Sequence, residues 1–506
     1  MSREPGVVGK HMGGSRDLVA ATTREVELDL SWSTVLSALA TAAEVLAIAF
    51  VPNVLLRKKE PAATFAWILV LLFMPGLGVV LFWYLGRDRV RRPVRRRVAE
   101  TAPIHERIEG RISVRFPDQR AEREAIILAQ PEEKQGVMRL AARMGRGEIR
   151  AGNAVRVLVG APATYDALLE AIAAATDHIH LEYYIFRPDR TGKRVLDALV
   201  EAARRGVKVR LLYDGFGSVG LGPACRPLRR AGGLAKPFFP LDPIRRAATM
   251  NLRNHRKLMV VDGRVGFCGG LNIGDMFLEW RDLHLRIDGP AVAELQKIFV
   301  EDWFFAARQD LTLPVFFPEI PKQGATIVQI VESGPDESVE SIHRLLFAAI
   351  ASARRTVRIA TPYFVPDRAV LVALQTAAMR GVDVRLIVPR VSNHRLTFHA
   401  GRSYYDELLA AGVHIHEYVP GMLHTKAMVV DGRFAIVGSA NLDVRSFRLN
   451  FELMAVLYDP AIIRELSVIF DEDLANTEEV DLAVWRERAL VTRVKEGVGR
   501  LFSPML

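Results

Sequence analysis

A short histidine–lysine–aspartate motif occurs twice in the 506-residue sequence, at an offset of 169 residues. The first copy, HRKLMVVDGR, contains His255, Lys257 and Asp262, and the second, HTKAMVVDGR, contains His424, Lys426 and Asp431. One imidazole can attack phosphorus while another protonates the leaving alcohol and then deprotonates an incoming one. Ammonium groups can neutralise the charge on the phosphate oxygens. The two copies together therefore suit phosphoryl transfer at a phosphodiester, with no metal ion or cofactor required.

Each motif is followed by a turn of small residues that ends in asparagine. The first turn, GGLN, ends at Asn272, and the second, GSAN, ends at Asn441. We expect the two amides to bind the nonbridging phosphate oxygens together with the lysines. A lone histidine-x-lysine pair would mean little, whereas the spacing repeated in two copies is a specific signal.

Four carboxylates accompany the motifs. Asp262 and Asp431 belong to the catalytic motif, but each precedes a glycine after an apolar strand, and Asp-Gly is a common hairpin turn, so a structural role is favoured. Asp282 and Glu452 follow the two asparagines by ten and eleven residues. A carboxylate that holds the far imidazole nitrogen fixes the tautomer, so we expect these two residues to orient the histidines. The alternative for both is a solvated surface position.

The segments upstream of the motifs also repeat. HIHLEYYIFRPD at 178–189 resembles VRIATPYFVPD at 357–367, and RGVKVRLLYDG at 205–215 resembles RGVDVRLIVPR at 380–390. Helical stretches alternate with β-branched strands, which is typical of an α/β sheet. We expect two tandem α/β domains, 151–310 and 311–506, that pack around a pseudo-two-fold axis so that the motifs meet.

Two further segments could touch a membrane surface. Residues 483–501 predict a C-terminal amphipathic helix, with packing on the domain favoured and membrane contact as the alternative. The stretch from Arg226 to Arg256 interleaves basic residues with Phe238 and Phe239, among them Arg245 and Arg246. It fits an interfacial surface or an active-site loop with a packed phenylalanine pair equally well.

The N-terminal part predicts a membrane anchor. A polar tail at 1–30 precedes an expected two-helix transmembrane hairpin at 31–87. The run from Phe65 to Leu85 is uncharged, whereas the run from Ser33 to Leu56 contains Glu44 and is the weaker candidate. Pro75, Gly76 and Gly78 interrupt the stronger run and could kink it or make it re-entrant.

The segment 88–150 is expected to be a basic juxtamembrane linker. Seven arginines lie between Arg87 and Arg97, and such a flank is typical of the cytoplasmic side. We therefore expect a multi-pass protein of the cell (inner) membrane with its catalytic part in the cytoplasm. The net charge of +10 indicates an anionic partner, and the anchor favours membrane lipid over nucleic acid.

The repeated motifs resemble those of the phospholipase D superfamily from about residue 151 to residue 506. The resemblance implies that His255 becomes a covalent phosphohistidine and that His424 is the general acid and base. It also implies phosphate binding by both lysines and both asparagines, and orientation of the histidines by Asp282 and Glu452.

Within that superfamily, the segments 61–87 and 251–275 and the sequence Trp280-Arg281-Asp282 resemble bacterial cardiolipin synthases. That resemblance implies transfer of a phosphatidyl group from one phosphatidylglycerol to another, with release of glycerol. A hydrolytic phospholipase D or another phosphatidyltransferase would carry the same motifs, and a membrane-anchored nuclease is a further alternative.

Overall fold

The computed structural model describes residues 32–56, 61–83, 91–144, 148–240, 251–337 and 339–506. The expected polar tail at 1–30 lies outside these residues. The chain divides into two compact units, Met1–Asp88 and Arg89–Leu506, and each is described by itself.

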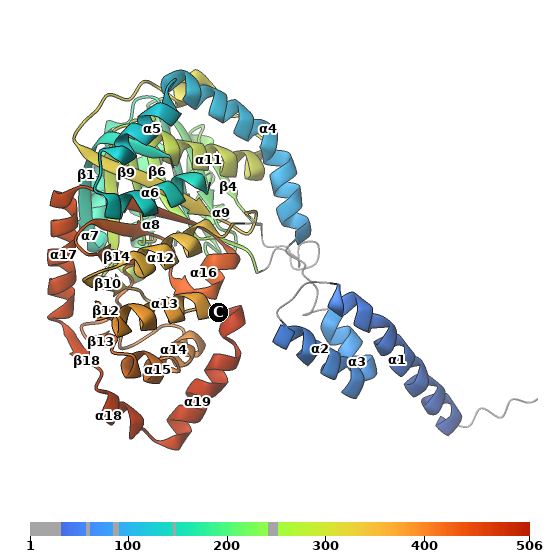
Figure 1. Cartoon of the computed structure of the whole chain (residues 1–506). Coiled ribbons are helices and arrows are strands. Elements are labelled where there is room, and N and C mark those ends of the chain that lie inside the picture. The colour runs from blue at the N-terminus through green and yellow to red at the C-terminus, as the bar shows by residue number, and fades with distance from the viewer. Residues whose placement is uncertain (1–31, 57–60, 84–90, 145–147, 241–250, 338) are drawn as a thin grey trace, which may run out of the picture. The chain divides into compact units, whose positions relative to one another are not determined.

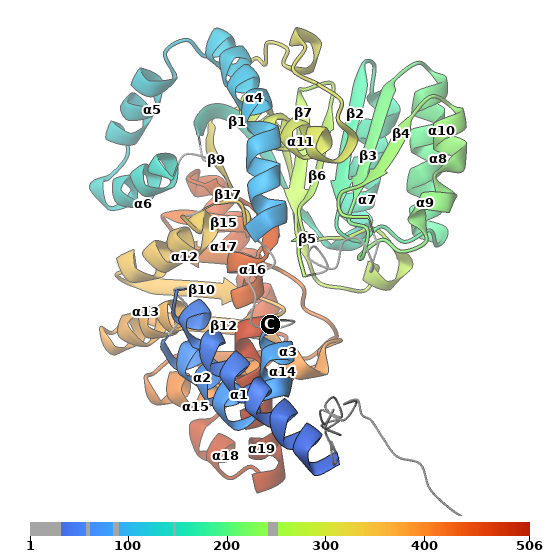
Figure 2. The same cartoon turned by 90° about the vertical axis from the view of Figure 1, so that its right-hand side faces the viewer.

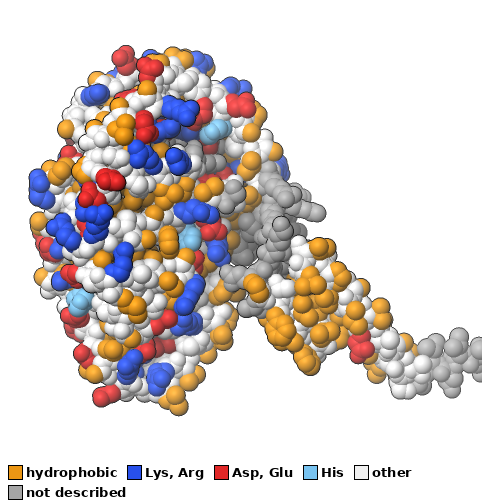
Figure 3. All heavy atoms as spheres, in the orientation of Figure 1, with side chains coloured by type: hydrophobic (Ala, Val, Ile, Leu, Met, Phe, Trp, Pro, Cys, Tyr) orange, Lys and Arg blue, Asp and Glu red, His pale blue; other side chains and the backbone are white. Residues whose placement is uncertain are grey.

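The first unit contains three apolar helices, α1 (Trp32–Leu55), α2 (Pro61–Phe73) and α3 (Pro75–Leu81). Among the described helices, α1 alone is long and apolar enough to cross a membrane. Its Ala47 and Val54 are buried against Leu71 and Phe82 of the following segment, while most other side chains of the unit are exposed. Figure 3 shows these exposed side chains as an almost continuous hydrophobic surface.

The second apolar run reverses direction at Met74, between α2 and α3. The rings of Trp67 and Phe82, which flank the reversal, lie 5.3 Å apart, and a Cβ on Gly78 would lie 2.6 Å from the carbonyl oxygen of Val70. Pro75 starts α3 because it has no N–H with which to continue α2. The described part of the run at 65–85 thus does not form one continuous helix, in line with the interruption by Pro75, and the helix of spanning length is α1, the weaker candidate.

The second unit begins with α4 (Arg91–Arg115), α5 (Gln119–Leu128) and α6 (Glu132–Arg143), within the segment expected to be a linker. Arg97 of α4 is 1% exposed and forms ion pairs with Asp302 and Asp336. Its guanidinium also lies 4.6 Å from the ring centroid of Phe451. This arginine therefore belongs to the protein interior and is not available to lipid headgroups.

The second unit is built on one sheet whose strand order is mirrored about its centre. The first half contributes β1 (Ile149–Val159), β2 (His178–Tyr183), β3 (Lys208–Tyr213), β4 (Leu234–Pro237), β6 (Lys257–Val261), β7 (Val265–Gly269) and β8 (Leu283–Asp288). The second half contributes β9 (Thr326–Ser333), β10 (Thr356–Ala360), β12 (Asp383–Pro389), β13 (His414–Tyr418), β14 (Ala427–Val430), β15 (Phe434–Gly438), β17 (Asn450–Leu457) and β18 (Thr477–Glu479).

The order β1-β8-β7-β6-β2-β3-β4 in the first half matches β9-β17-β15-β14-β10-β12-β13 in the second. The halves join through antiparallel pairing of β1 with β9, where Ile149 pairs with Gln329. Figure 2 shows the first half in green and the second in orange to red. The tandem α/β arrangement predicted from the repeat is confirmed, and the pseudo-two-fold axis passes between the central strands. Short strands β5 (Arg253–Asn254), β11 (Phe364–Val365) and β16 (Leu442–Asp443) lie beside this sheet.

Helices cover both faces of the sheet (Figures 1 and 2). They are α7 (Gly160–Ala174), α8 (Arg190–Arg204), α9 (Leu221–Ala224), α10 (Arg226–Arg230), α11 (Val292–Ala307), α12 (Ser341–Ser352), α13 (Arg368–Met379), α14 (Arg395–Arg402), α15 (Tyr405–Ala410), α16 (Val444–Arg448), α17 (Pro460–Leu474), α18 (Leu482–Arg486) and α19 (Leu490–Leu501). The repeat extends to the caps, because Asp189 accepts a hydrogen bond from the first turn of α8 and Asp367 does the same for α13.

The two possible membrane-contact segments differ in exposure. Phe238 and Phe239 are buried and pack against Phe305 and Phe451, so the packed-pair interpretation is correct, while Arg245 and Arg246 lie outside the described residues. The C-terminal helix α19 packs on α14, and its apolar side chains remain largely exposed, with Leu501 at 79%.

Candidate active site

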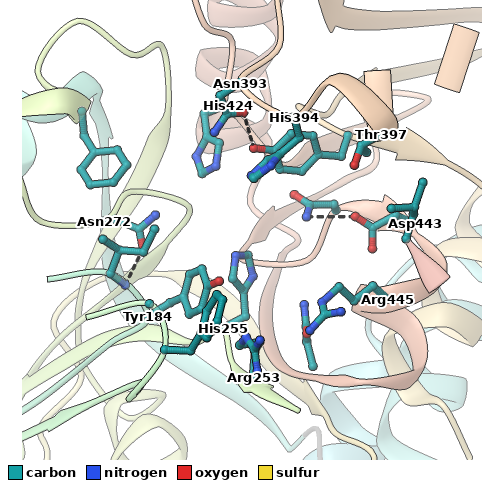
Figure 4. Close-up of a pocket in the computed structure, with 18 of the residues that line it drawn as sticks. Tyr184, Arg253, His255, Asn272, Asn393, His394, Thr397, His424, Asp443 and Arg445 are labelled. Carbon is teal, nitrogen blue, oxygen red and sulfur yellow. Dashed lines mark hydrogen bonds between the residues drawn. The ribbon is translucent and has the colours of Figure 1, made fainter. Parts of the chain in front are cut away.

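The two motifs meet at one pocket of about 480 Å³ between the halves (Figure 4). His255 lies between β5 and β6, and His424 lies just before β14. Both histidines line the pocket with Asn272 and Asn441. The mirrored strand order makes this meeting necessary, because each motif sits at the same end of an equivalent strand.

Backbone hydrogen bonds join each motif to the opposite half. The His255 N–H donates to the Phe451 carbonyl at 2.9 Å, and the His424 N–H donates to the Arg281 carbonyl at 2.7 Å. Each of these carbonyls belongs to the residue before a predicted orienting carboxylate. The backbone of one half thus fixes the histidine of the other.

The carboxylates also cross between the halves. His255 Nδ1 lies 2.9 Å from Glu452 Oε2, and His424 Nδ1 lies 2.6 Å from Asp282 Oδ2. A proton on Nδ1 that is donated to the carboxylate leaves the Nε2 lone pair free to act as a base or nucleophile. Asp282 and Glu452 are fully enclosed, so the solvated-surface alternative is excluded for both. Each catalytic pair is completed only when both halves are folded together.

The turns of small residues pack directly against these carboxylates. A Cβ on Gly270 would lie 2.2 Å from Asp282 Oδ1, so this position has no room for a side chain. The equivalent residue in the other half, Ser439, donates its hydroxyl to Glu452 Oε2 at 2.5 Å. Asn450 Nδ2 donates to the other oxygen of Glu452 at 3.1 Å. The two turns are therefore part of the support for the histidines.

Burial controls the protonation of the site. It lowers the pKa of His255 to about 4 and of His424 to about 3 despite the adjacent carboxylates. It also lowers the pKa of Lys257 to about 7 and of Lys426 to about 8. Near neutral pH, the empty site thus holds neutral imidazoles.

The orienting carboxylates are ionised. Burial by itself would raise the pKa of Asp282, but Lys426 and His424 lower it overall. Burial would likewise raise the pKa of Glu452, but His255 chiefly, and Lys257 as well, lower it overall. At neutral pH both carboxylates are therefore ionised beside lysines that are only partly protonated.

Asn272 and Asn441 line the pocket, although each amide is already engaged by the protein. Asn272 Oδ1 accepts from the N–H of Ile185 at 3.1 Å, which leaves Nδ2 for a ligand. Asn441 Nδ2 donates to Asp443 Oδ2 at 3.1 Å. The Nδ2 group of Asn441 has a second hydrogen, which can be donated to a phosphate oxygen.

Asp262 and Asp431 do not line the pocket. Their φ angles are +52° and +53°, which are typical of a tight turn. Asp262 accepts from the backbone N–H groups of 176–178, and Asp431 accepts from those of 354–356. Each carboxylate therefore fastens a hairpin turn to the loop before the neighbouring strand, which is the structural role that the Asp-Gly pattern favoured.

Sequence reasoning missed several residues of the pocket wall. The ring of Tyr184 lies 4.7 Å from that of His255, and the ring of Trp280 lies 4.9 Å from that of His424. In the repeated segments Tyr184 corresponds to Pro362 and Tyr363 to Ile185, so the repeat does not pair the two tyrosines that line the pocket. No local pattern indicated Arg253 or Arg445.

The middle residue of the first motif, Arg256, supports the site from behind. It is fully buried and forms ion pairs with Asp302 and Glu332. Its Nε also donates to the carbonyl of Glu452 at 3.3 Å. Arg97 pairs with the same Asp302, so the first helix of the unit contributes to the region behind His255.

Comparisons with known proteins agree with this geometry. The family model described as "Cardiolipin synthase, PLD-like domain" matches residues 168–303 and 346–474, one stretch in each half. A second model, "Phospholipase D-nuclease N-terminal", matches residues 45–87. The N-terminal unit and the two halves of the catalytic unit are thus matched by different family models.

Two curated relatives match most of the chain. Cardiolipin synthase of Geobacillus sp. (strain WCH70) is 41% identical over 471 residues, which cover 91% of either chain. Cardiolipin synthase 2 of Bacillus anthracis is 39% identical over 463 residues, or 90% of this chain and 88% of that one. In fold alone, the crystal structure of phosphatidylserine synthase from Haemophilus influenzae Rd KW20 is similar, with a TM-score of 0.57 at 15% identity over 73% of this chain and all of that one. The chain therefore belongs to the cardiolipin synthases of the phospholipase D family and is a membrane-associated phosphatidyltransferase.

Proposed function

We propose that this protein transfers a phosphatidyl group from one phosphatidylglycerol to a second, releasing glycerol, through a covalent phosphohistidine. The observation that carries the proposal is the crossing of the two histidine–carboxylate pairs at one pocket with two buried lysines. This arrangement supplies a nucleophile, an acid–base group and cations for the phosphate at a single place.

In the first step, His255 Nε2 attacks phosphorus, and the bond from phosphorus to the headgroup glycerol oxygen breaks. Before this step His424 takes up a proton at Nε2 and becomes an imidazolium held by Asp282. It then gives that proton to the glycerol oxygen, so glycerol leaves as a neutral alcohol and His424 becomes neutral. The second step reverses the roles, because neutral His424 takes the proton of a hydroxyl on the second phosphatidylglycerol. That oxygen attacks phosphorus, the bond to His255 breaks, and cardiolipin is released. The assignment of His255 as nucleophile follows the resemblance to the superfamily.

The two lysines neutralise the negative charge of the phosphate. Lys257 and Lys426 must be protonated to bind the nonbridging oxygens, and an anionic phosphate raises their pKa values once it has entered. Asp282 and Glu452 stabilise the imidazolium that forms transiently on each histidine. Asn272 Nδ2 can donate a further hydrogen bond to the phosphate.

Product analysis tests the proposal. Purified protein in detergent receives phosphatidylglycerol alone, and cardiolipin, free glycerol and phosphatidic acid are followed over time. We expect equal amounts of cardiolipin and glycerol, and their loss in both His255→Ala and His424→Ala. Phosphatidic acid without cardiolipin would instead establish a hydrolase. No turnover of any lipid, together with degradation of nucleic acid, would establish the nuclease alternative.

We further infer that the first unit lies in the cell (inner) membrane and that the catalytic unit is cytoplasmic. α1 has the length to cross, whereas α2 covers only roughly 20 Å before the chain turns back at Met74. One crossing and a re-entrant hairpin fit these elements better than the two crossings expected from the sequence. Labelling with a membrane-impermeant maleimide should reach Ser33→Cys and Leu56→Cys from opposite sides of the membrane, and labelling of both from one side would contradict a single crossing.

A further inference from the structure

The pocket departs from the two-fold pattern of the catalytic groups in its arginines, of which Arg187, Arg253 and Arg445 line the wall. Arg253 lies two residues before His255, and the equivalent position before His424 is Met422. Arg445 lies four residues after Asn441, and the equivalent position after Asn272 is Met276. The histidines, lysines, asparagines and orienting carboxylates occur in both halves, whereas these two arginines have no counterparts. A function that only one side of the site performs would explain this difference.

The two arginines come from different halves and lie at one side of the pocket. Both line it, and Figure 4 shows them next to His255, on the side away from His424. On the opposite side, Met276 and Trp280 line the wall, and the Trp280 ring contacts His424. The His255 side of the pocket thus carries Arg253, Arg445 and the carboxylate of Asp443, and a third arginine, Arg187, lines the wall beside Gly274.

The fold holds both guanidinium groups in place. Arg253 belongs to β5, which pairs with β17, and its guanidinium lies 4.0 Å from the ring centroid of Phe216. Arg445 Nη2 donates to the carbonyl of Asn251 at 2.7 Å, and its own N–H donates to the carbonyl of Leu506. The hydrogen bond that fixes the Arg445 guanidinium thus goes to a neutral carbonyl, and its charge remains available for an anion.

The two arginines are close enough to repel each other. Burial lowers the pKa of Arg445 and the charge of Arg253 lowers it further, whereas the nearby Asp443 and Asp214 raise it in part. A second anion between them would relieve both effects. Guanidinium groups bind phosphate through paired N–H donors, which gives both affinity and orientation.

From this one-sided placement we infer that Arg253 and Arg445 form a second phosphate site, which holds the phosphodiester of the acceptor lipid. The inference rests on the proposed function, in which one phosphate reacts between the histidines and the other does not react. Only the three carbons of one glycerol separate the two phosphates of the product, so both must lie within this pocket. The lysines then serve the reacting phosphate and the arginines serve the spectator.

The test compares two reactions that use the same donor, phosphatidylglycerol, but different acceptors. Cardiolipin formation needs an acceptor that carries a phosphate, whereas exchange of radiolabelled glycerol into phosphatidylglycerol needs only the phosphatidyl-enzyme and a neutral alcohol. Arg253→Met and Arg445→Met install the residue that the other half has at the equivalent position. We expect kcat/KM for cardiolipin formation to fall roughly 10- to 100-fold in each variant, as for the loss of a charge-assisted hydrogen bond, while glycerol exchange stays within about twofold.

Retained exchange also shows that the variants are folded. Arg230→Met, which removes an exposed arginine of α10, is the matched control and should alter neither reaction. The inference is overturned if both reactions fall together, because the arginines would then serve the donor, or if cardiolipin formation is unchanged. Absence of both reactions in the wild-type protein would instead refute the proposed function, on which the inference rests.

Discussion

At the scale of residues, burial turns ordinary side chains into an acid–base site. His255 and His424 are neutral because the interior disfavours imidazolium, and each is paired with an ionised carboxylate that becomes useful only when the ring gains a proton. The same burial brings the lysines close to deprotonation at neutral pH. The site is therefore prepared to change charge when a phosphate enters.

These pKa values predict the pH dependence. Lys257 and Lys426 bind phosphate when protonated, and their pKa values of about 7 and about 8 are below the usual value, so the charge is lost as pH rises through this range. We expect kcat/KM to fall as pH rises through about 7 to 8, because the two lysines lose the charge that binds phosphate. Lys257→Arg keeps the positive charge and should move the decline to higher pH. A wild-type profile that stays flat to about pH 9 would show that the lysine charge does not limit binding.

At the scale of elements, the same hairpin is fastened twice in the same way. Asp431 ends the hairpin of β14 and β15 with a left-handed φ, and its carboxylate accepts three N–H groups from the loop before β10. Asp262 does the same in the first half, where it ends the hairpin of β6 and β7 and accepts N–H groups from the loop before β2. The motif aspartate thus fixes the strand that carries the lysine, at a distance from the chemistry.

Asp431→Asn tests this division of roles. Asparagine tolerates the left-handed conformation, but its amide nitrogen cannot accept the N–H groups that one carboxylate oxygen receives. We expect the free energy of unfolding of the catalytic unit to fall by about 1.5–3 kcal/mol, with kcat per folded molecule unchanged. Thermal unfolding and active-site titration measure the two quantities, and Asp383→Asn on the surface is the control. A large loss of kcat at an unchanged free energy of unfolding would contradict this prediction and would indicate that Asp431 takes part in the acid–base chemistry.

At the scale of the whole molecule, two halves share one site because each completes the other. Asp282 of the first half holds His424 of the second, and Glu452 of the second holds His255 of the first. Within the described residues, neither catalytic histidine is paired with a carboxylate of its own half. Two copies of one α/β unit thus form a single centre, and the inferred role of the one-sided arginines is to hold the acceptor lipid apart from the donor.

This architecture predicts the result of mixing inactive chains. Because both pairs form within one chain, His255→Ala protein mixed with His424→Ala protein should make no more cardiolipin than either does alone. The mixture is assayed after joint detergent extraction and reconstitution, so that the chains have the opportunity to associate. Recovery of even a quarter of the wild-type rate would mean that the halves exchange between copies.

The sequence by itself determined the chemistry and the repeated fold. Three local patterns carried the prediction: the spacing of the motifs, the alternation of strands and helices, and the Asp-Gly turns. Local patterns can be recognised in the sequence because they involve residues close together along the chain. The carboxylates Asp282 and Glu452 could also be named from their spacing. Which histidine each one holds could not, since the partners are 142 and 197 residues apart along the chain.

Tertiary structure decided the remaining features, because each depends on contacts between distant segments. Arg97 is part of a basic run in the sequence, but burial against Asp302 and Asp336 makes it an interior ion pair. The apolar run at 65–85 has the length of a span, but Pro75 and the close approach of Gly78 to Val70 fold it back on itself. Arg253 and Arg445 become neighbours only when the two halves join, since no periodicity relates a residue in β5 to one in α16.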